Sequence, residues 1–160
     1  MQIRTAVITI SDRASQGLYD DLGGPAVKKA AEGYGWKVVA EALVPDEKRE
    51  IQRAIREGIA QGCHLILTTG GTGVAARDVT PEAVREIAVR ELPGFGEVMR
   101  VESLKLTPNA ILSRNLAVVV DKALVIALPG KPSGAVECLR FVVGAIPHCI
   151  EVLQEVPTSC

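Results

Sequence analysis

The chain has 160 residues, a net charge of −1, 48% apolar residues and 23% charged residues. This length and composition are typical of a soluble globular protein, and we expect residues 1–160 to form a single domain. The near-neutral charge argues against a nucleic-acid partner, and the 3% of aromatic residues leaves little for base stacking. The sequence shows no signal-peptide pattern and no apolar run long enough to span a membrane, so we expect a cytoplasmic protein.

Apolar runs of strand length alternate with amphipathic segments of helix length. The expected strands are Thr5–Ile10, Trp36–Val44, His64–Thr69, Asn115–Val120 and Ala123–Pro129. Only Asp121 and Lys122 separate the last two strands, and this gap is typical of an antiparallel hairpin. The alternation predicts an α/β fold with three layers, α/β/α, in which a mostly parallel sheet becomes mixed at the late hairpin.

The expected helices carry start and stop signals. They lie at 23–35, at 47–61, from Thr80 onward, at 93–106 (helical or irregular) and at 132–153. Asp46 is placed to cap the start of the second helix, and Thr80 is placed to cap the start of the third. Gly62 is placed to end the second helix, and Pro147 is expected to bend or break the last one.

The four cysteines form no CxxC pair and no zinc-ligand pattern. We therefore predict free thiols in a reducing compartment. Cys160 is the last residue of the chain, and we expect its thiol to be exposed.

Polar residues gather where the predicted strands end. The segments concerned are Ser11-Asp12-Arg13, Pro45-Asp46, the glycine turn Gly70-Gly71-Thr72-Gly73 with Asp78, and Pro129-Gly130-Lys131. The carboxyl ends of parallel strands share one edge of a sheet, and ligands bind beyond that edge in open α/β folds. We therefore expect the functional site there.

The glycine turn from Gly70 to Gly73 has two interpretations. Its backbone N–H groups converge on a phosphate, or it is a tight strand-to-helix connection that needs a positive φ. It is not a phosphate-binding loop of the Walker A type, because no Gly-Lys-Ser/Thr follows. It is not a dinucleotide fingerprint either, because Ala76 stands where the third glycine would be.

The charged residues also have two interpretations each. Asp78 supports the start of a helix, or it holds Mg²⁺ against phosphate oxygens. Asp12 caps a helix or a turn, Arg77 contacts a phosphate or forms a surface salt bridge, and Lys131 pairs with a phosphate or faces solvent. Glycines, carboxylates and cations in this combination are typical of phosphoryl or nucleotidyl transfer with Mg²⁺.

These motifs, in this order, resemble the Mog/MoaB family of molybdenum cofactor biosynthesis, which includes gephyrin and Cnx-type G domains. The matching stretches are "TISDRAS", "VPDE", "LTTGGTGVAARDVTPEAV", "PGFGEVMR", "LTPNAILSR" and "LPGKPSGAVECL". The resemblance implies a three-layer fold and Mg²⁺-dependent transfer of AMP from ATP to molybdopterin, with release of pyrophosphate. It also implies a homo-oligomer, either a trimer or a hexamer, and contact with the protein that inserts molybdate.

The resemblance assigns roles to individual residues. Asp46 and Asp78 match aspartates that the family uses for catalysis and for metal binding. The positions that match ligand-binding residues are Ser11, Asp12, Gly70, Gly71, Thr72, Gly73, Glu97, Ser103, Ser113, Pro129, Gly130 and Lys131. Ser103 and Ser113 match serines on the side of the pterin and its phosphate. The loop that contains Lys131 varies within the family, so the resemblance fixes no role for that residue.

Two other functions are compatible with this fold class. A binding module would hold molybdopterin for carriage or regulation without transferring AMP, and the presence of both Asp46 and Asp78 argues against it. A dinucleotide-dependent oxidoreductase is disfavoured because the first strand leads into "SDRASQG" and not into a glycine fingerprint.

Overall fold

The computed structural model describes residues 1–159 and contains a six-stranded mixed sheet with the strand order β2-β1-β3-β6-β5-β4. The strands are β1 (Arg4–Ile10), β2 (Lys37–Val44), β3 (Leu65–Thr69), β4 (Arg90–Glu91), β5 (Leu116–Val120) and β6 (Ala123–Leu128). β1, β2, β3 and β6 run parallel to one another. β5 is antiparallel to both of its neighbours. The predicted mixed sheet is confirmed.

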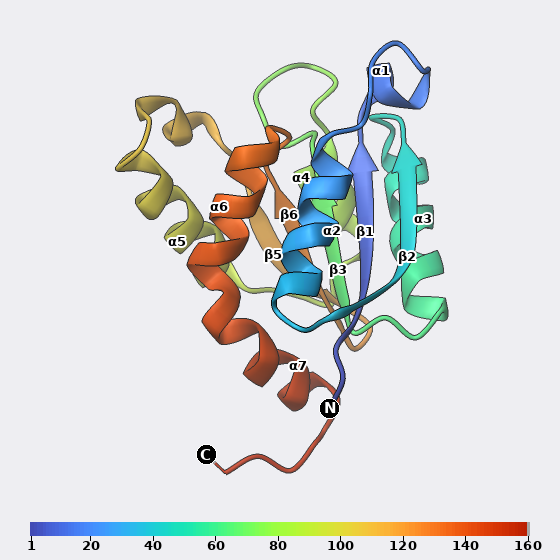
Figure 1. The fold of residues 1–160 in the computed structure, drawn as a ribbon, viewed down its shortest axis with the longest axis vertical. Helices are drawn as coiled ribbons and strands as arrows, with labels where there is room; N and C mark the ends of the chain where they lie inside the picture. Colours follow the sequence, from blue (N-terminus) through green and yellow to red (C-terminus); the bar gives the residue numbers. More distant parts are fainter. Residues whose placement is uncertain (160) are drawn as a thin grey trace.

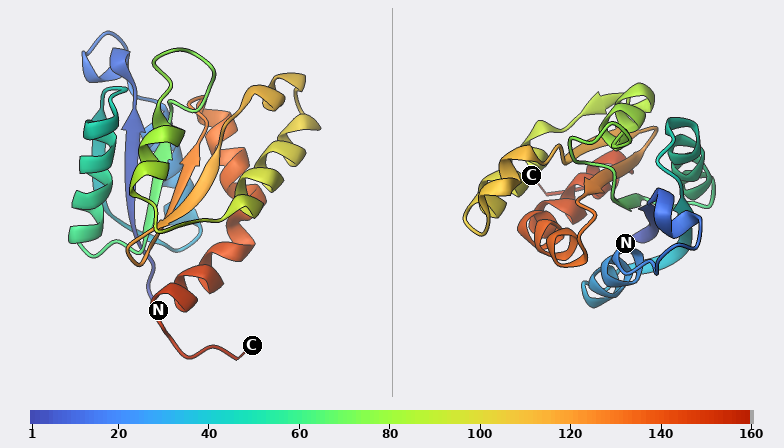
Figure 2. Two further views of the ribbon diagram at one scale, coloured as in Figure 1. Left: turned by 180° about the vertical axis from the view of Figure 1, so that it is seen from behind. Right: turned by 90° about the horizontal axis from the view of Figure 1, so that it is seen from above.

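Helices cover both faces of this sheet, which confirms the three layers (Figures 1 and 2). The helices are α1 (Asp12–Ser15), α2 (Gly23–Gly33), α3 (Lys48–Ala60), α4 (Thr80–Ile87), α5 (Pro93–Leu104), α6 (Pro132–Val142) and α7 (Ile146–Leu153). Two short 3₁₀ helices, η1 (Pro108–Leu112) and η2 (Val143–Ala145), complete the set within residues 1–159. Figure 1 shows α2, α6 and α7 in front of the sheet, and α3 and α4 lie on the opposite face in Figure 2.

The core has one apolar cluster on each face of the sheet. Side chains alternate along β3, so Leu65 and Leu67 pack in the cluster with α2, α6 and α7. Ile66 packs in the other cluster, with α3 and α4. Because both faces are buried, the central strands are apolar throughout, and this is the pattern by which the sequence predicted them.

The predicted hairpin and the predicted helix ends are confirmed. Val120 pairs with Ala123 across a turn in which Asp121 has a φ of 52°, as hairpin turns of this length require. Gly62 follows α3 with a φ of 82°. The last helix is interrupted at Val143–Ala145, and Pro147 lies in the first turn of α7.

Two capping predictions are wrong. Glu47 precedes α3 and makes no side-chain cap, while the carboxylate of Asp46 accepts a hydrogen bond from the backbone of Asp12. Thr80 is the first residue of α4, and its hydroxyl donates to the carbonyl of Gly70 instead of capping the helix. Asp46 thus contacts the loop after β1, and Thr80 contacts the start of its own connection from β3, in place of the local caps.

Cys63, Cys138 and Cys149 are free, as predicted, and the prediction for Cys160 lies outside the described residues. Across residues 1–159, every helix is too short or too polar to cross a bilayer.

Candidate functional site

The carboxyl ends of β1, β2, β3 and β6 meet at one edge of the sheet, at the top of Figure 1. Loops from all four strands surround a cavity of about 320 Å³, which we call the first cavity. The predicted site residues that line it are Ser11, Asp46, Gly70, Gly71, Asp78 and Gly130. The expectation that the strand ends would bring these residues together is confirmed.

The packing requires glycine at two positions after β3. Gly70 has a φ of +108°, and a Cβ there would lie 2.1 Å from the carbonyl oxygen of Ile10. Gly71 has a φ of +69°, and a Cβ there would lie 2.3 Å from Thr80 Oγ1. The turn is therefore a tight strand-to-helix connection. It also offers a donor, because within residues 1–159 the N–H of Gly71 makes no hydrogen bond.

The loop after this turn holds Asp78 in a defined position. The N–H of Ala75 donates to Asp78 Oδ2 over 3.0 Å, and the N–H of Asp78 donates to the carbonyl of Ala75 over 3.0 Å. A Cβ on Gly73 would lie 2.8 Å from Asp78 Oδ2. The absence of a side chain at Gly73 thus gives the carboxylate room to fold back over its own loop.

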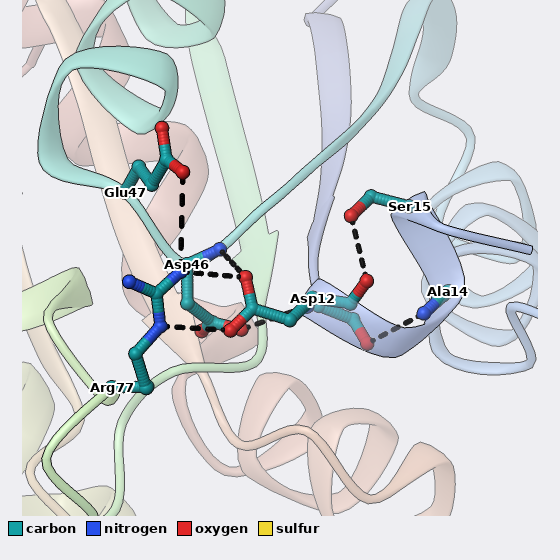
Figure 3. A network of polar contacts seen from close by, with 7 residues as sticks. Asp12, Ala14, Ser15, Asp46, Glu47 and Arg77 are labelled. Atoms are coloured by element: carbon teal, nitrogen blue, oxygen red, sulfur yellow. Dashed lines mark hydrogen bonds and ion pairs between the residues drawn. The ribbon is translucent and has the colours of Figure 1, made fainter. Parts of the chain in front are cut away.

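Asp12 and Asp46 are joined by a reciprocal pair of hydrogen bonds (Figure 3). The N–H of Asp12 donates to Asp46 Oδ2, and the N–H of Asp46 donates to Asp12 Oδ1, each over 2.9 Å. Arg77 donates from Nε and from Nη2 to the two oxygens of Asp12, each over 2.9 Å. The glycine loop is therefore tied to the ends of β1 and β2, and Arg77 forms the surface salt bridge that was one of its two interpretations.

The pKa values of the two linked aspartates are shifted in opposite directions. The hydrogen bond from Arg77 lowers the pKa of Asp12. Burial raises the pKa of Asp46, and repulsion from the carboxylates of Asp12 and Asp78 adds to the effect. Within the described chain, neither Asp46 nor Asp78 forms an ion pair with a basic side chain. The first cavity thus holds negative charge that a bound cation would stabilise.

The carboxylate oxygens of Asp46 and Asp78 fit a magnesium ion that is also bound by a phosphate. Mg²⁺ is often bound in proteins by one or two carboxylates together with substrate phosphates and water. Asp46 and Asp78 supply such a pair beside the first cavity. Within residues 1–159, no group of three or more His, Cys, Asp or Glu side chains is arranged to hold a metal ion without a substrate.

A second cavity, of about 410 Å³, adjoins the first. Of the predicted residues, Ser103, Ser113, Pro129 and Lys131 line it. The loop after β6 divides the two cavities, because Gly130 and Pro132 line the first while Pro129, Lys131 and Ser133 line the second. In the part of the chain that the structure describes, Lys131 is the single Lys or Arg that lines either cavity.

Some predicted site residues line neither cavity. Three of them support the loops around the first cavity. Asp12 and Gly73 do so through the contacts given above, and the carbonyl of Thr72 accepts a hydrogen bond from the backbone N–H of Arg114. Glu97 is exposed on α5 and lines a separate hollow beside Arg85 and Arg100. Glu97 shares this hollow with Ser113, which also lines the second cavity, but Glu97 itself lines neither of the two cavities.

Sequence reasoning missed Asp21, a third carboxylate on the wall of the first cavity. Its Oδ1 accepts the N–H of Gly24 over 2.9 Å, and its Oδ2 accepts the hydroxyl of Thr9 over 2.8 Å. An aspartate three residues before a glycine at a helix start is a recognisable capping signal, and it could have been found.

Comparisons with known proteins identify the family of this chain. A family model described as a probable molybdopterin binding domain matches residues 6–148. The chain belongs to this family of molybdopterin-binding domains. Similar curated relatives include the molybdopterin adenylyltransferases of Helicobacter pylori strain J99 (44% identity, 94% of this chain, 88% of the relative) and Escherichia coli K12 (41% identity, 95% of this chain, 86% of the relative).

Other members of the molybdopterin-binding family confirm the resemblance to MoaB and gephyrin. The crystal structure of the molybdopterin biosynthesis enzyme MoaB from Thermus thermophilus superimposes with a TM-score of 0.90 at 40% identity, over 99% of this chain and all of that one. Gephyrin from Dictyostelium discoideum is 39% identical over 96% of this chain, which corresponds to 23% of that protein.

Proposed function

We infer that this chain is a molybdopterin adenylyltransferase of molybdenum cofactor biosynthesis. In the reaction, an oxygen of the terminal phosphate of molybdopterin forms a bond to the α-phosphorus of ATP. The bond from that phosphorus to the β-phosphate oxygen breaks, and pyrophosphate leaves. The products are adenylyl-molybdopterin and pyrophosphate. The names and the coverage of the curated relatives support this assignment, because the match extends over almost the whole chain.

The observation that carries this function is the pair of adjoining cavities divided by the loop after β6. A transfer between two substrates needs two binding sites that meet where the reacting groups lie. The first cavity takes the ATP phosphates, which Gly71 and Gly130 approach with their backbones. The second cavity takes the pterin, close to Ser103 and Ser113.

The charges on the walls explain how the reacting phosphates are held. Asp46 and Asp78 would bind Mg²⁺, which neutralises charge on the phosphates of ATP when it is bound. Lys131 lies on the dividing loop, where its ammonium group would orient the phosphate of molybdopterin toward the α-phosphorus. Asp12 acts indirectly, since its two hydrogen bonds hold the backbone and the carboxylate of Asp46 in place.

The chain also carries apolar side chains suited to an oligomer interface. They are Val89, just before β4, and Val98, Val101, Leu104, Leu106, Ile111 and Leu112, which lie on or between α5 and η1. Each has 43% or more of its surface exposed. Such a concentration of exposed apolar residues is typical of a protein–protein contact. We assign it to a homo-oligomer, a trimer or a hexamer, that acts in the cytoplasm and passes its product to the molybdate-insertion protein.

The proposed reaction is tested with ATP labelled at the α-phosphate. Purified protein is mixed with molybdopterin and labelled ATP, with Mg²⁺ or with EDTA in its place. We expect label on the pterin together with one pyrophosphate for each adenylate, and we expect neither product in EDTA. Molybdopterin that binds but acquires no label in Mg²⁺ would show a carrier and not a transferase.

A further inference from the structure

Arg114 lies between two residues that line the second cavity, Ser113 and Asn115. The three residues precede β5 in sequence and connect η1 to the sheet. The side chain of Arg114 does not line the second cavity, and its polar contacts lie at the glycine loop that carries Asp78. The segment from Ser113 to Asn115 thus lines the second cavity and also contacts the glycine loop beside the first cavity.

Arg114 binds the glycine loop at three carbonyl groups. Its backbone N–H donates to the carbonyl of Thr72 over 2.8 Å, and its Nε donates to the carbonyl of Gly73 over 2.8 Å. Its Nη2 donates to the carbonyl of Asp78 over 2.6 Å, and its Nη1 forms an ion pair with Glu82 of α4. The guanidinium group therefore joins the two ends of the loop and the helix that follows.

Arg77 ties this loop to Asp12 on one side, and the contacts within the loop itself are few. Residues 74–77 are exposed, and the hydrogen bonds between Ala75 and Asp78 span only four residues. A guanidinium group is a planar fork with fixed donor directions, so one arginine can fix the separation of two carbonyl groups. The ammonium group of a lysine is a single point and would hold one carbonyl at a time.

We propose that Arg114 is the positioning residue that holds Asp78 at the first cavity and links this position to the segment that lines the second cavity. The proposal rests on the proposed adenylyl transfer, because it gives Asp78 a role in that reaction. Arg114 touches no reacting atom. It acts by keeping the backbone of Asp78 at a fixed distance from Gly73 and from the wall formed by Ser113 and Asn115.

The test compares Arg114→Gln and Arg114→Lys with the wild type in the full-length protein. A small displacement of a catalytic group lowers turnover strongly, so we expect kcat of Arg114→Gln to fall about 10²-fold. The KM for molybdopterin should change by less than about threefold, since Arg114 does not touch the second cavity. Arg114→Lys should recover part of kcat, because lysine keeps one of the donors.

Hydrogen exchange of the peptide that covers residues 72–79 provides a readout apart from activity. We expect faster exchange there in Arg114→Gln than in wild type, with unchanged exchange in β1 and β3. Arg85→Gln is the matched control. Arg85 lies on α4 and forms an ion pair with Glu91 of β4, and it makes no contact with the glycine loop. It should behave as wild type in both measurements.

The possible outcomes separate this inference from the proposed function. An Arg114→Gln protein with wild-type kcat, or one in which only the KM for molybdopterin rises, would overturn the positioning role. If Arg114→Gln does not fold, Arg114→Lys alone decides, and wild-type kcat together with wild-type exchange in that variant would also overturn it. A wild-type protein that forms no adenylate would refute the proposed function, while the exchange of residues 72–79 would still show whether Arg114 holds the loop.

Discussion

Asp46 is half-buried near two other carboxylates, and this has a measurable consequence at the scale of a single residue. Its pKa is raised, so the folded protein binds the proton of Asp46 more tightly than the unfolded chain does. The stabilisation from this proton is present at low pH and is lost as the pH rises through the raised pKa. At neutral pH the ionised Asp46 therefore lowers the free energy of unfolding, as expected of a residue kept for function.

We predict that Asp46→Asn raises the melting temperature at pH 7 by about 2–4 °C, because asparagine can still accept from Asp12 and carries no charge. The difference should shrink as the pH falls toward the range in which Asp46 is protonated. Thermal unfolding between pH 4 and pH 8 measures this, with the exposed Asp20→Asn as control. A lower melting temperature than wild type at pH 7 would contradict the electrostatic account.

At the scale of elements, the glycine turn joins β3 to α4 through contacts that leave no room for a side chain. We predict that Gly70→Ala lowers the melting temperature by more than about 4 °C, because alanine disfavours the positive φ and its Cβ would overlap the Ile10 carbonyl. Gly33→Ala at the end of α2, where a Cβ would meet nothing within 4 Å, should leave the melting temperature equal or higher. Equal melting temperatures for the two variants would show that the turn relaxes freely.

The same scale shows what the sequence could predict. β1, β3, β5 and β6 are buried on both faces, so their apolar runs were visible, and the two-residue gap after Val120 predicted the hairpin. The four-residue α1 and the two-residue β4 are too short to show a period. The caps at Asp46 and Thr80 were wrong because Asp46 binds the loop after β1 and Thr80 binds Gly70 at the start of its own connection. Both contacts depend on how the chain folds back on itself.

The site was predictable to a similar extent. The rule that ligands bind at the carboxyl ends of parallel strands placed Ser11, Asp46, Gly70 and Gly130 at one edge. Which residues touch across that edge was not predictable, since the pairing of Asp12 with Asp46 depends on how two loops meet. The division of the edge into two cavities depends in the same way on the path of the loop after β6.

At the scale of the whole molecule, the exposed apolar residues just before β4 and on or between α5 and η1 predict an oligomer. Ile111 is 73% exposed in the single chain, so Ile111→Glu should leave the fold intact while placing a charge in the interface. We expect light scattering to give a multiple of the 17.0 kDa chain for wild type and a smaller mass for Ile111→Glu. Val152→Glu, outside this surface on α7, is the control. A monomeric wild type would contradict the assignment.

The measurement that tests the central claim most directly is transfer of label from α-labelled ATP to molybdopterin by wild type and by Asp78→Asn. Asparagine has nearly the same shape and removes only the charge, so we expect the variant to be slower by about 10²-fold or more. Asp20→Asn should transfer label at the wild-type rate. An Asp78→Asn protein that forms adenylyl-molybdopterin as fast as wild type would mean that the carboxylate at the first cavity takes no part in the reaction.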